Sequence, residues 1–153
     1  MGNKKSKPVT EKAFIKGGPK FGRYKVSAKE DRTYDDIVFD SKWEMHTYKL
    51  LKSLLPDAHI HRQVEFLLQP KFKSSDGKAV REINYASDFV ITRDGNLLPD
   101  TVPAGALVLD SKGHVTDIFK LKNKLFMYKY GTIIHQVKKA ADLIPIVNKF
   151  KGE

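Results

Sequence analysis

Two aspartates and a lysine lie in apolar stretches where charged side chains are costly. Asp88 stands in the stretch Tyr-Ala-Ser-Asp-Phe-Val-Ile, while Asp110 ends the stretch Ala-Leu-Val-Leu-Asp and is followed two residues later by Lys112. Both stretches are typical of buried β-strands, so two anions held there need compensation. A divalent cation such as Mg²⁺ would supply it, because hard cations prefer oxygen ligands.

These groups match the needs of phosphodiester hydrolysis. That reaction requires stabilisation of charge in the transition state, an activated water and neutralisation of the leaving oxygen. Asp88, Asp110 and the backbone carbonyl of Ser111 are candidate metal ligands, and Lys112 is a candidate for steadying charge on the phosphate. Strand alternation predicts that Asp110 and Lys112 point to one side and Ser111 to the other. A lysine that merely pairs with Asp110 would show the same spacing.

The composition predicts one soluble, intracellular domain. The 153 residues are 41% hydrophobic, which is enough for a single core. Cysteine is absent, which excludes disulfide frameworks, thiolate nucleophiles and cysteine-rich zinc sites. No apolar run approaches the roughly 20 residues that span a bilayer, and the start lacks the apolar core of a signal peptide.

Positive charge is concentrated at the start of the chain. Residues 1–33 hold ten lysines and arginines against three carboxylates, a net +7 out of the formal +10 of the whole chain. The balance points to a polyanionic partner, most simply a nucleic acid. We expect a flexible basic arm over 1–33, either a solvated tail or a phosphate-binding segment, and a folded domain over 34–153.

Periodicity and turn residues predict an α/β fold in the order α-β-β-β-α-β-α, a mixed central sheet flanked by helices. Ser41 caps the first helix and Pro56 closes it. The expected strands cover 58–69, with a bulge, 80–92, 105–110 and 132–137. The other expected helices cover 119–129, ended by Gly131, and 138–150, where Pro145 breaks or kinks the chain.

Glu44 is a third candidate ligand, on the first helix. It stands three residues after Ser41, so it is equally suited to a capping box that stabilises the helix start. Other candidates keep similar alternatives. Asp88 has Arg62 and Arg81 as alternative ion-pair partners, and Gln63 and Glu65 lie on the exposed side of their strand, within reach of a metal-bound water.

Basic residues after Lys112 are candidates for contact with the DNA backbone. His114 follows Lys112 closely enough to contact a phosphate. In the expected helix 119–129, Lys120, Lys122 and Lys124 would border a cleavage site at the end of the preceding strand.

Taken together, Glu44, Asp88 and the run Asp110-Ser-Lys112 resemble the PD-(D/E)xK nuclease superfamily. More closely, these residues and their neighbours look like small phage-encoded endonucleases related to the phage endonuclease I type of Holliday-junction resolving enzyme. The likeness spans roughly residues 34–137. Two positions depart from the superfamily pattern: Ser87 stands where proline is frequent, and Asp110 where glutamate is frequent.

The resemblance implies a restriction-endonuclease-like core and a Mg²⁺- or Mn²⁺-dependent endonuclease. Glu44, Asp88 and Asp110 would be the metal ligands and Lys112 the catalytic lysine. It further implies branched DNA, the Holliday junction, as substrate in phage replication or recombination. A homodimer with two active sites would cut two strands, in the cytoplasm of a bacterium or phage-infected host cell.

Two other classes of protein remain open. One is a non-catalytic DNA-binding module that inherited the nuclease fold, against which the intact Glu44, Asp88, Asp110 and Lys112 argue. The other is a membrane-tethered basic protein, because the first six residues fit a short pattern for N-myristoylation. Nothing else in the chain indicates a membrane, and one acyl chain anchors weakly.

Overall fold

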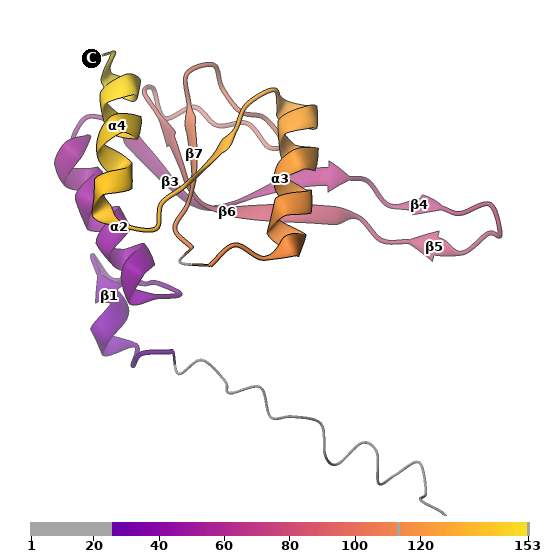
Figure 1. Ribbon diagram of the computed structural model, residues 1–153, viewed down its shortest axis with the longest axis horizontal. Helices are drawn as coiled ribbons and strands as arrows, with labels where there is room; N and C mark the ends of the chain where they lie inside the picture. Colours follow the sequence, from indigo (N-terminus) through magenta and orange to yellow (C-terminus); the bar gives the residue numbers. More distant parts are fainter. Residues whose placement is uncertain (1–25, 113, 153) are drawn as a thin grey trace, which may run out of the picture.

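A four-stranded mixed sheet forms the centre of the protein (Figure 1). The computed structural model describes residues 26–112 and 114–152. The sheet has the strand order β3-β6-β7-β8. Its strands are β3 (His59–Gln69), β6 (Ile83–Thr92), β7 (Leu107–Asp110) and β8 (Ile134–Gln136). The fold is therefore mixed α/β with helices flanking the sheet, and its main elements follow the predicted order.

Pairing directions in this sheet reflect its connections. β3 pairs with β6 and β6 with β7 in antiparallel fashion, whereas β7 pairs with β8 in parallel. A parallel pair needs a crossover, which helix α3 (Asp117–Tyr130) provides between β7 and β8. The predicted bulge in the first strand occurs near its end, where the register shifts between Leu67 and Gln69.

The predicted helix boundaries are set by local caps. Helix α2 (Lys42–Leu54) begins after Ser41, whose Oγ accepts a hydrogen bond from the Glu44 N–H at 3.0 Å. α3 ends at Gly131, whose left-handed backbone (φ 67°) suits glycine. Helix α4 (Ala140–Lys151) continues through Pro145, so the predicted break is wrong. The start of α4 is stabilised by the Asp142 carboxylate, which accepts hydrogen bonds from the Lys138 and Lys139 N–H groups.

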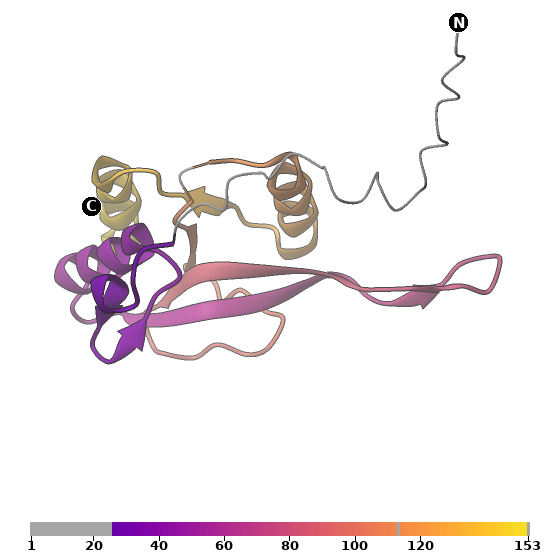
Figure 2. The ribbon, with the colours of Figure 1, turned by 90° about the horizontal axis from the view of Figure 1, so that it is seen from below.

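Two apolar clusters hold the sheet between its helices. In the first, Leu51 of α2 and Leu143 of α4 pack against Phe89 and Leu109 of the sheet. In the second, Phe126 of α3 packs against the strand residues Phe66, Tyr85, Val90 and Val108. Figure 2 shows α2 and α4 at one end of the sheet and α3 farther along it. Both groups of helices therefore pack against β6 and β7, the strands that carry Asp88 and Asp110.

The predicted strand 80–92 is split into two. A ribbon of β4 (Phe72–Lys73) and β5 (Ala79–Val80) extends beyond β3 and β6 (Figure 1). Pro70 lies in the gap between β3 and β4, and it has no N–H to donate to the ladder. The ladder is interrupted there, and residues 81–82 on the opposite side are not paired.

The ordered elements begin just before the expected domain boundary at residue 34. A 3₁₀ turn, η1 (Glu30–Arg32), leads into the hairpin of β1 (Thr33–Tyr34) and β2 (Ile37–Val38). The Arg32 guanidinium donates to the Phe39 carbonyl and ties this segment to the start of α2. Most of the predicted basic arm, residues 1–25, lies outside the described residues. None of the described helices is long and apolar enough to cross a membrane.

Candidate active site

The strand register places four polar residues in one row across the sheet. Phe89 pairs with Leu109, so Asp88 comes level with Asp110 on the next strand. Because the residues on either side of Gln63 pair with Phe89 and Ser87, Gln63 lies opposite Asp88. On the other side, Asp110 pairs with Gln136 of β8. Neighbours in such a row lie close together on one face, so the two aspartates are brought together as the sequence predicts.

Asp110 is a fully buried carboxylate with one oxygen left without a donor. Its Oδ2 accepts a hydrogen bond from the Tyr85 hydroxyl at 3.0 Å and lies 3.2 Å from the Lys112 Nζ. Its Oδ1 has no hydrogen-bond partner among the described residues. Burial and the neighbouring charge of Asp88 raise the pKa of Asp110. A buried anionic oxygen without a partner is costly to the fold, and it suits a cation.

Asp88 is held by the residue that follows Asp110. Its Oδ2 accepts hydrogen bonds from both the backbone N–H and the hydroxyl of Ser111, each at 2.7 Å. Ser111 therefore does not turn away from the site, because β7 ends at Asp110 and strand alternation no longer applies. The ion pair that Arg62 was expected to offer goes elsewhere: its guanidinium lies 3.6 Å from the Glu44 carboxylate.

Glu44 serves both the helix start and the site. Its Oε2 accepts the Asp40 N–H at 3.0 Å, so the reach back ends one residue before the expected Ser41. Its Oε1 accepts the Gln63 side-chain amide at 2.9 Å, which links α2 to the polar row. The residue as a whole is only 2% exposed. Burial and the charge of Asp88 raise the pKa of Glu44.

Asp88 is the centre of this acidic group. Its charge raises the pKa of Glu44 on one side and of Asp110 on the other. All three carboxylates are engaged by protein donors: Glu44 by Gln63, Asp88 by Ser111, and Asp110 by Tyr85. Within the described ranges, no group of three or more His, Cys, Asp or Glu side chains is arranged to hold a metal ion. The unpartnered Oδ1 of Asp110 is the atom that fits a cation ligand.

Lys112 and the start of α3 flank the acidic group. The Lys112 side chain is 51% exposed, and its Nζ lies 5.6 Å from the centre of the Phe119 ring. Lys120 follows Phe119 and pairs with Asp117 at 3.1 Å.

The predicted DNA-contacting residues do not form one face. At roughly 100° per residue, Lys120 and Lys124 share a side of α3, while Lys122 projects from the opposite side, where it is partly buried. His114 is exposed, beyond the end of β7. Of the three lysines, Lys120 lies beside the residue that contacts Lys112.

Two residues gained their importance from the tertiary structure. Tyr85 was predicted only as part of a strand, yet burial and the charge of Asp110 raise its pKa, so its hydroxyl remains a donor. Gln63 has a left-handed backbone (φ 48°), which is uncommon for a residue other than glycine. Strict alternation would place Tyr85 on the opposite face from Asp88, so only the path of the strands could reveal its contact with Asp110.

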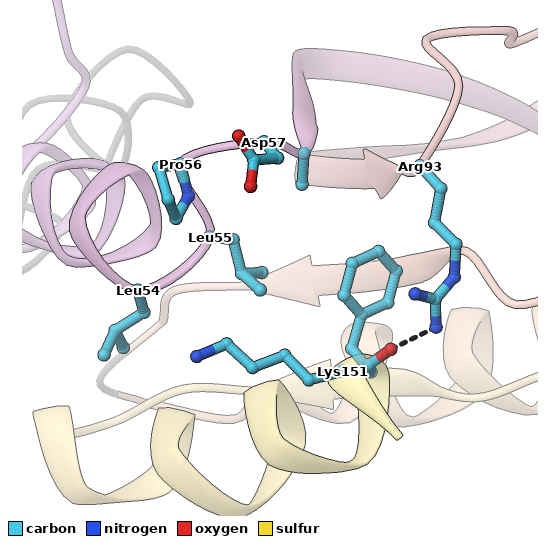
Figure 3. A pocket seen from close by; sticks show the side chains of 8 residues that line it. Leu54, Leu55, Pro56, Asp57, Arg93 and Lys151 are labelled. Carbon is cyan, nitrogen blue, oxygen red and sulfur yellow. Dashed lines mark hydrogen bonds between the residues drawn. The ribbon is translucent and has the colours of Figure 1, made fainter. Parts of the chain in front are cut away.

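A separate hollow lies between the C-terminal ends of α2 and α4 (Figure 3). Leu54, Leu55 and Pro56 line one side, and Arg93 and Lys151 the other. The Arg93 guanidinium stacks 4.3 Å from the Phe150 ring and donates to the Phe150 carbonyl, so it is engaged in packing. None of the candidate catalytic residues lines this hollow.

Comparison with known proteins places the chain in a family. A family model described as "Protein of unknown function (DUF1064)" matches residues 23–143, most of the chain. The chain belongs to this family. The match includes every candidate site residue from Glu44 to Lys124. No curated protein and no solved structure matches the chain.

Proposed function

We propose that this chain is a metal-dependent endodeoxyribonuclease, built on a restriction-endonuclease-like core, that hydrolyses DNA phosphodiester bonds. The observation that carries the proposal is the buried, unpartnered Oδ1 of Asp110, level with Asp88 and paired with Lys112. An anionic oxygen without a donor is an open ligand position for Mg²⁺ or Mn²⁺. These three residues, together with Glu44, carry the resemblance to PD-(D/E)xK nucleases.

The residues that would hold the cation are Glu44, Asp88, Asp110 and the backbone carbonyl of Ser111. The cation would supply positive charge where negative charge develops on the phosphate, and it would make a coordinated water more acidic. The protein groups around it keep the ligands in place: Tyr85 and Lys112 orient Asp110, and Gln63 and the Asp40 N–H orient Glu44.

Lys112 would act on the phosphate itself. Its Nζ lies 3.2 Å from Asp110 while half of the side chain is exposed, so a short rotation brings the ammonium towards a bound backbone. A positive charge placed there stabilises the charge that forms on the phosphate oxygens. His114 and Lys120, near Lys112 in sequence or space, are the next candidates for phosphate contact.

Nicking of supercoiled DNA tests the proposal. With Mg²⁺ or Mn²⁺ the parent protein should cut, whereas Asp110→Asn and Lys112→Ala should lose cutting by about 100-fold or more, as for removal of groups that stabilise a transition state. Lys151→Ala, on the far end of α4, is the matched control and should cut as the parent does. Variants that cut as well as the parent would overturn the site assignment.

Within this proposal, the specific substrate is branched DNA. The form of the protein that cuts it is a homodimer. A comparison of linear, nicked and four-way substrates should show preference for the four-way junction, and sedimentation should give two chains per particle. DNA binding with no cutting under any divalent cation would instead support the non-catalytic DNA-binding module.

A further inference from the structure

The ribbon of β4 and β5 projects beyond the end of the sheet, away from all the helices (Figures 1 and 2). It continues β3 and β6, the strands that carry Gln63 and Asp88. At its tip Ser74 N–H donates to the Lys78 carbonyl at 2.9 Å, and Gly77 takes a left-handed backbone (φ 79°) that completes the turn. A two-stranded ribbon has little stability of its own. Its register is therefore maintained by the long strands behind it.

The ribbon and its base carry positive charge. Phe72 pairs with Val80 and Lys73 with Ala79, so alternation within the ribbon places Lys73 on the face opposite to Phe72 and Val80. Lys71 and Arg81 flank the base of the ribbon, one residue outside β4 and β5. All three cations are exposed, and none forms an ion pair within the described part of the chain.

The carboxylates near the ribbon cancel this charge only in part. Asp76 at the tip is paired with Lys78 at 2.9 Å. Glu65, Glu82 and Asp100 line a hollow at the base of the ribbon, and Lys71 lines the same hollow, so its charge is partly offset there. Lys73 lies farther out on β4, and neither Lys73 nor Arg81 lines this hollow.

We propose that the ribbon is a second DNA-binding element, which contacts the phosphate backbone of the duplex to one side of the cleavage site. The inference rests on the proposed function, because it takes DNA as the ligand. Exposed, unpaired cations at fixed spacing favour phosphates. A two-stranded ribbon also has the dimensions of a DNA groove.

The spacing along the strand gives the position of this contact. Arg81 precedes Asp88 by seven residues, which is about 23 Å at 3.3 Å per residue. The same length corresponds to about seven base pairs at roughly 3.4 Å each. DNA bound at Asp88 would thus reach these cations within one turn of the double helix.

The experiment measures binding without cleavage. Affinity for a duplex of about 30 base pairs is determined in EDTA across a range of salt concentrations, for the full-length parent and for Lys71→Ala/Lys73→Ala/Arg81→Ala. Each lost phosphate contact should lower the slope of log Kd against log salt by about 1. We expect the triple variant to lose about 3 from the slope and at least about fivefold in affinity.

A matched variant separates the ribbon from overall charge. Lys138→Ala/Lys149→Ala/Lys151→Ala removes the same charge from exposed lysines at or before α4, at the other end of the molecule (Figure 1). This α4 variant should keep a steeper slope of log Kd against log salt than the ribbon variant. A third variant, Lys71→Arg/Lys73→Arg/Arg81→Lys, keeps all three charges and should bind DNA as tightly as the parent does.

The outcomes distinguish this inference from the proposed function. If the ribbon variant and the α4 variant lose DNA affinity and salt dependence equally, the ribbon contact is overturned, even if the parent cuts DNA. A selective loss in the ribbon variant would support the contact, even if no cation gives cutting. No measurable binding by the parent would overturn both.

Discussion

At the scale of single residues, the properties of the site follow from how the two carboxylate oxygens of Asp110 are bonded. Tyr85 and Lys112 engage one oxygen, while the other oxygen is buried without a donor. The carboxylate therefore costs the protein stability when it is ionised and nothing is bound to it. Such local instability is typical of a position kept for function.

The first prediction concerns Asp110→Asn in the absence of metal. The pKa of Asp110 is raised in the folded protein, so folding is favoured while the group is protonated, and that contribution is lost as pH rises through the folded pKa. Replacement by the neutral amide removes this loss. Thermal unfolding in EDTA at pH 7 should show the variant to be more stable by about 1 kcal/mol, and the difference should shrink towards pH 4.

Asp76→Asn provides the comparison for that measurement. Hydrogen bonds from Ser74 and Lys78 lower the pKa of Asp76, so its ionised form is favoured in the folded protein. Its replacement by asparagine should bring no gain in thermal stability at pH 7.

Added Mg²⁺ should stabilise the parent protein more than it stabilises the Asp110→Asn variant. An Asp110→Asn variant that is less stable than the parent at pH 7 and unchanged in its response to Mg²⁺ would contradict the assignment.

The second prediction concerns Tyr85→Phe. Loss of the hydroxyl leaves the buried Asp110 with Lys112 as its remaining partner, so the free energy of unfolding should fall by about 1–2 kcal/mol. Affinity for Mn²⁺, measured by calorimetry, should also fall because the carboxylate is no longer oriented. Tyr128→Phe, at a side chain 93% exposed, is the control and should change neither quantity. Unaltered Mn²⁺ affinity in Tyr85→Phe would show that Tyr85 does not position Asp110.

At the scale of elements, the start of α2 connects helix stability to the site. Ser41 caps the helix, and the Glu44 side chain then extends to the Asp40 N–H and to Gln63 on β3. One short segment therefore determines both where the helix begins and where Glu44 lies. Gln63, which makes this link, has a φ of 48°, a backbone conformation that costs free energy in a residue other than glycine.

The third prediction compares two helix caps. Ser41→Ala should destabilise the protein by about 1 kcal/mol through loss of the cap, and it should also reduce Mg²⁺-dependent cutting because Glu44 is less well placed. Gly131→Ala should cost a similar amount, since a side chain at φ 67° is strained even though nothing lies within 4 Å. Denaturant unfolding and nicking rates measure both effects. Equal cutting by the two variants at matched stability would argue against a role for Glu44.

At the scale of the whole molecule, positive charge is distributed unevenly along the chain. The formal net charge is +10, and residues 1–25 alone carry eight lysines and arginines against one carboxylate. The candidate site residues lie outside this segment, in the helices and strands from α2 to α3 and in the connection between β7 and α3. Under the proposed function, the first 25 residues would add affinity for DNA, whereas the folded part of the chain would carry the cutting site.

The fourth prediction concerns removal of residues 1–25. The truncated protein should retain its fold by circular dichroism and should still nick DNA at low salt. Its affinity should fall by at least about tenfold at 0.1 M salt, with a shallower salt dependence, because sequence-independent contacts to phosphates are lost. Salt-dependent binding and nicking under identical conditions measure both. Unchanged affinity would assign the segment to solubility alone.

The sequence by itself determined the order of the main helices and strands and the identity of the acidic residues. Capping by Ser41, termination at Gly131 and the alternation along the strands are local signals, so they are readable without the fold. The break considered at Pro145 does not occur, because a proline in the second turn of a helix is tolerated when the surrounding packing is favourable.

Only the tertiary structure decided how these residues meet. The register that brings Asp88 level with Asp110, the bond from Tyr85 and the link from Gln63 to Glu44 all join segments far apart in sequence. The break at Pro70 likewise turned one expected strand into a sheet strand and a ribbon. Periodicity specifies which face a residue occupies within its own strand. It does not specify which residue of the neighbouring strand lies beside it, because pairing depends on long-range packing.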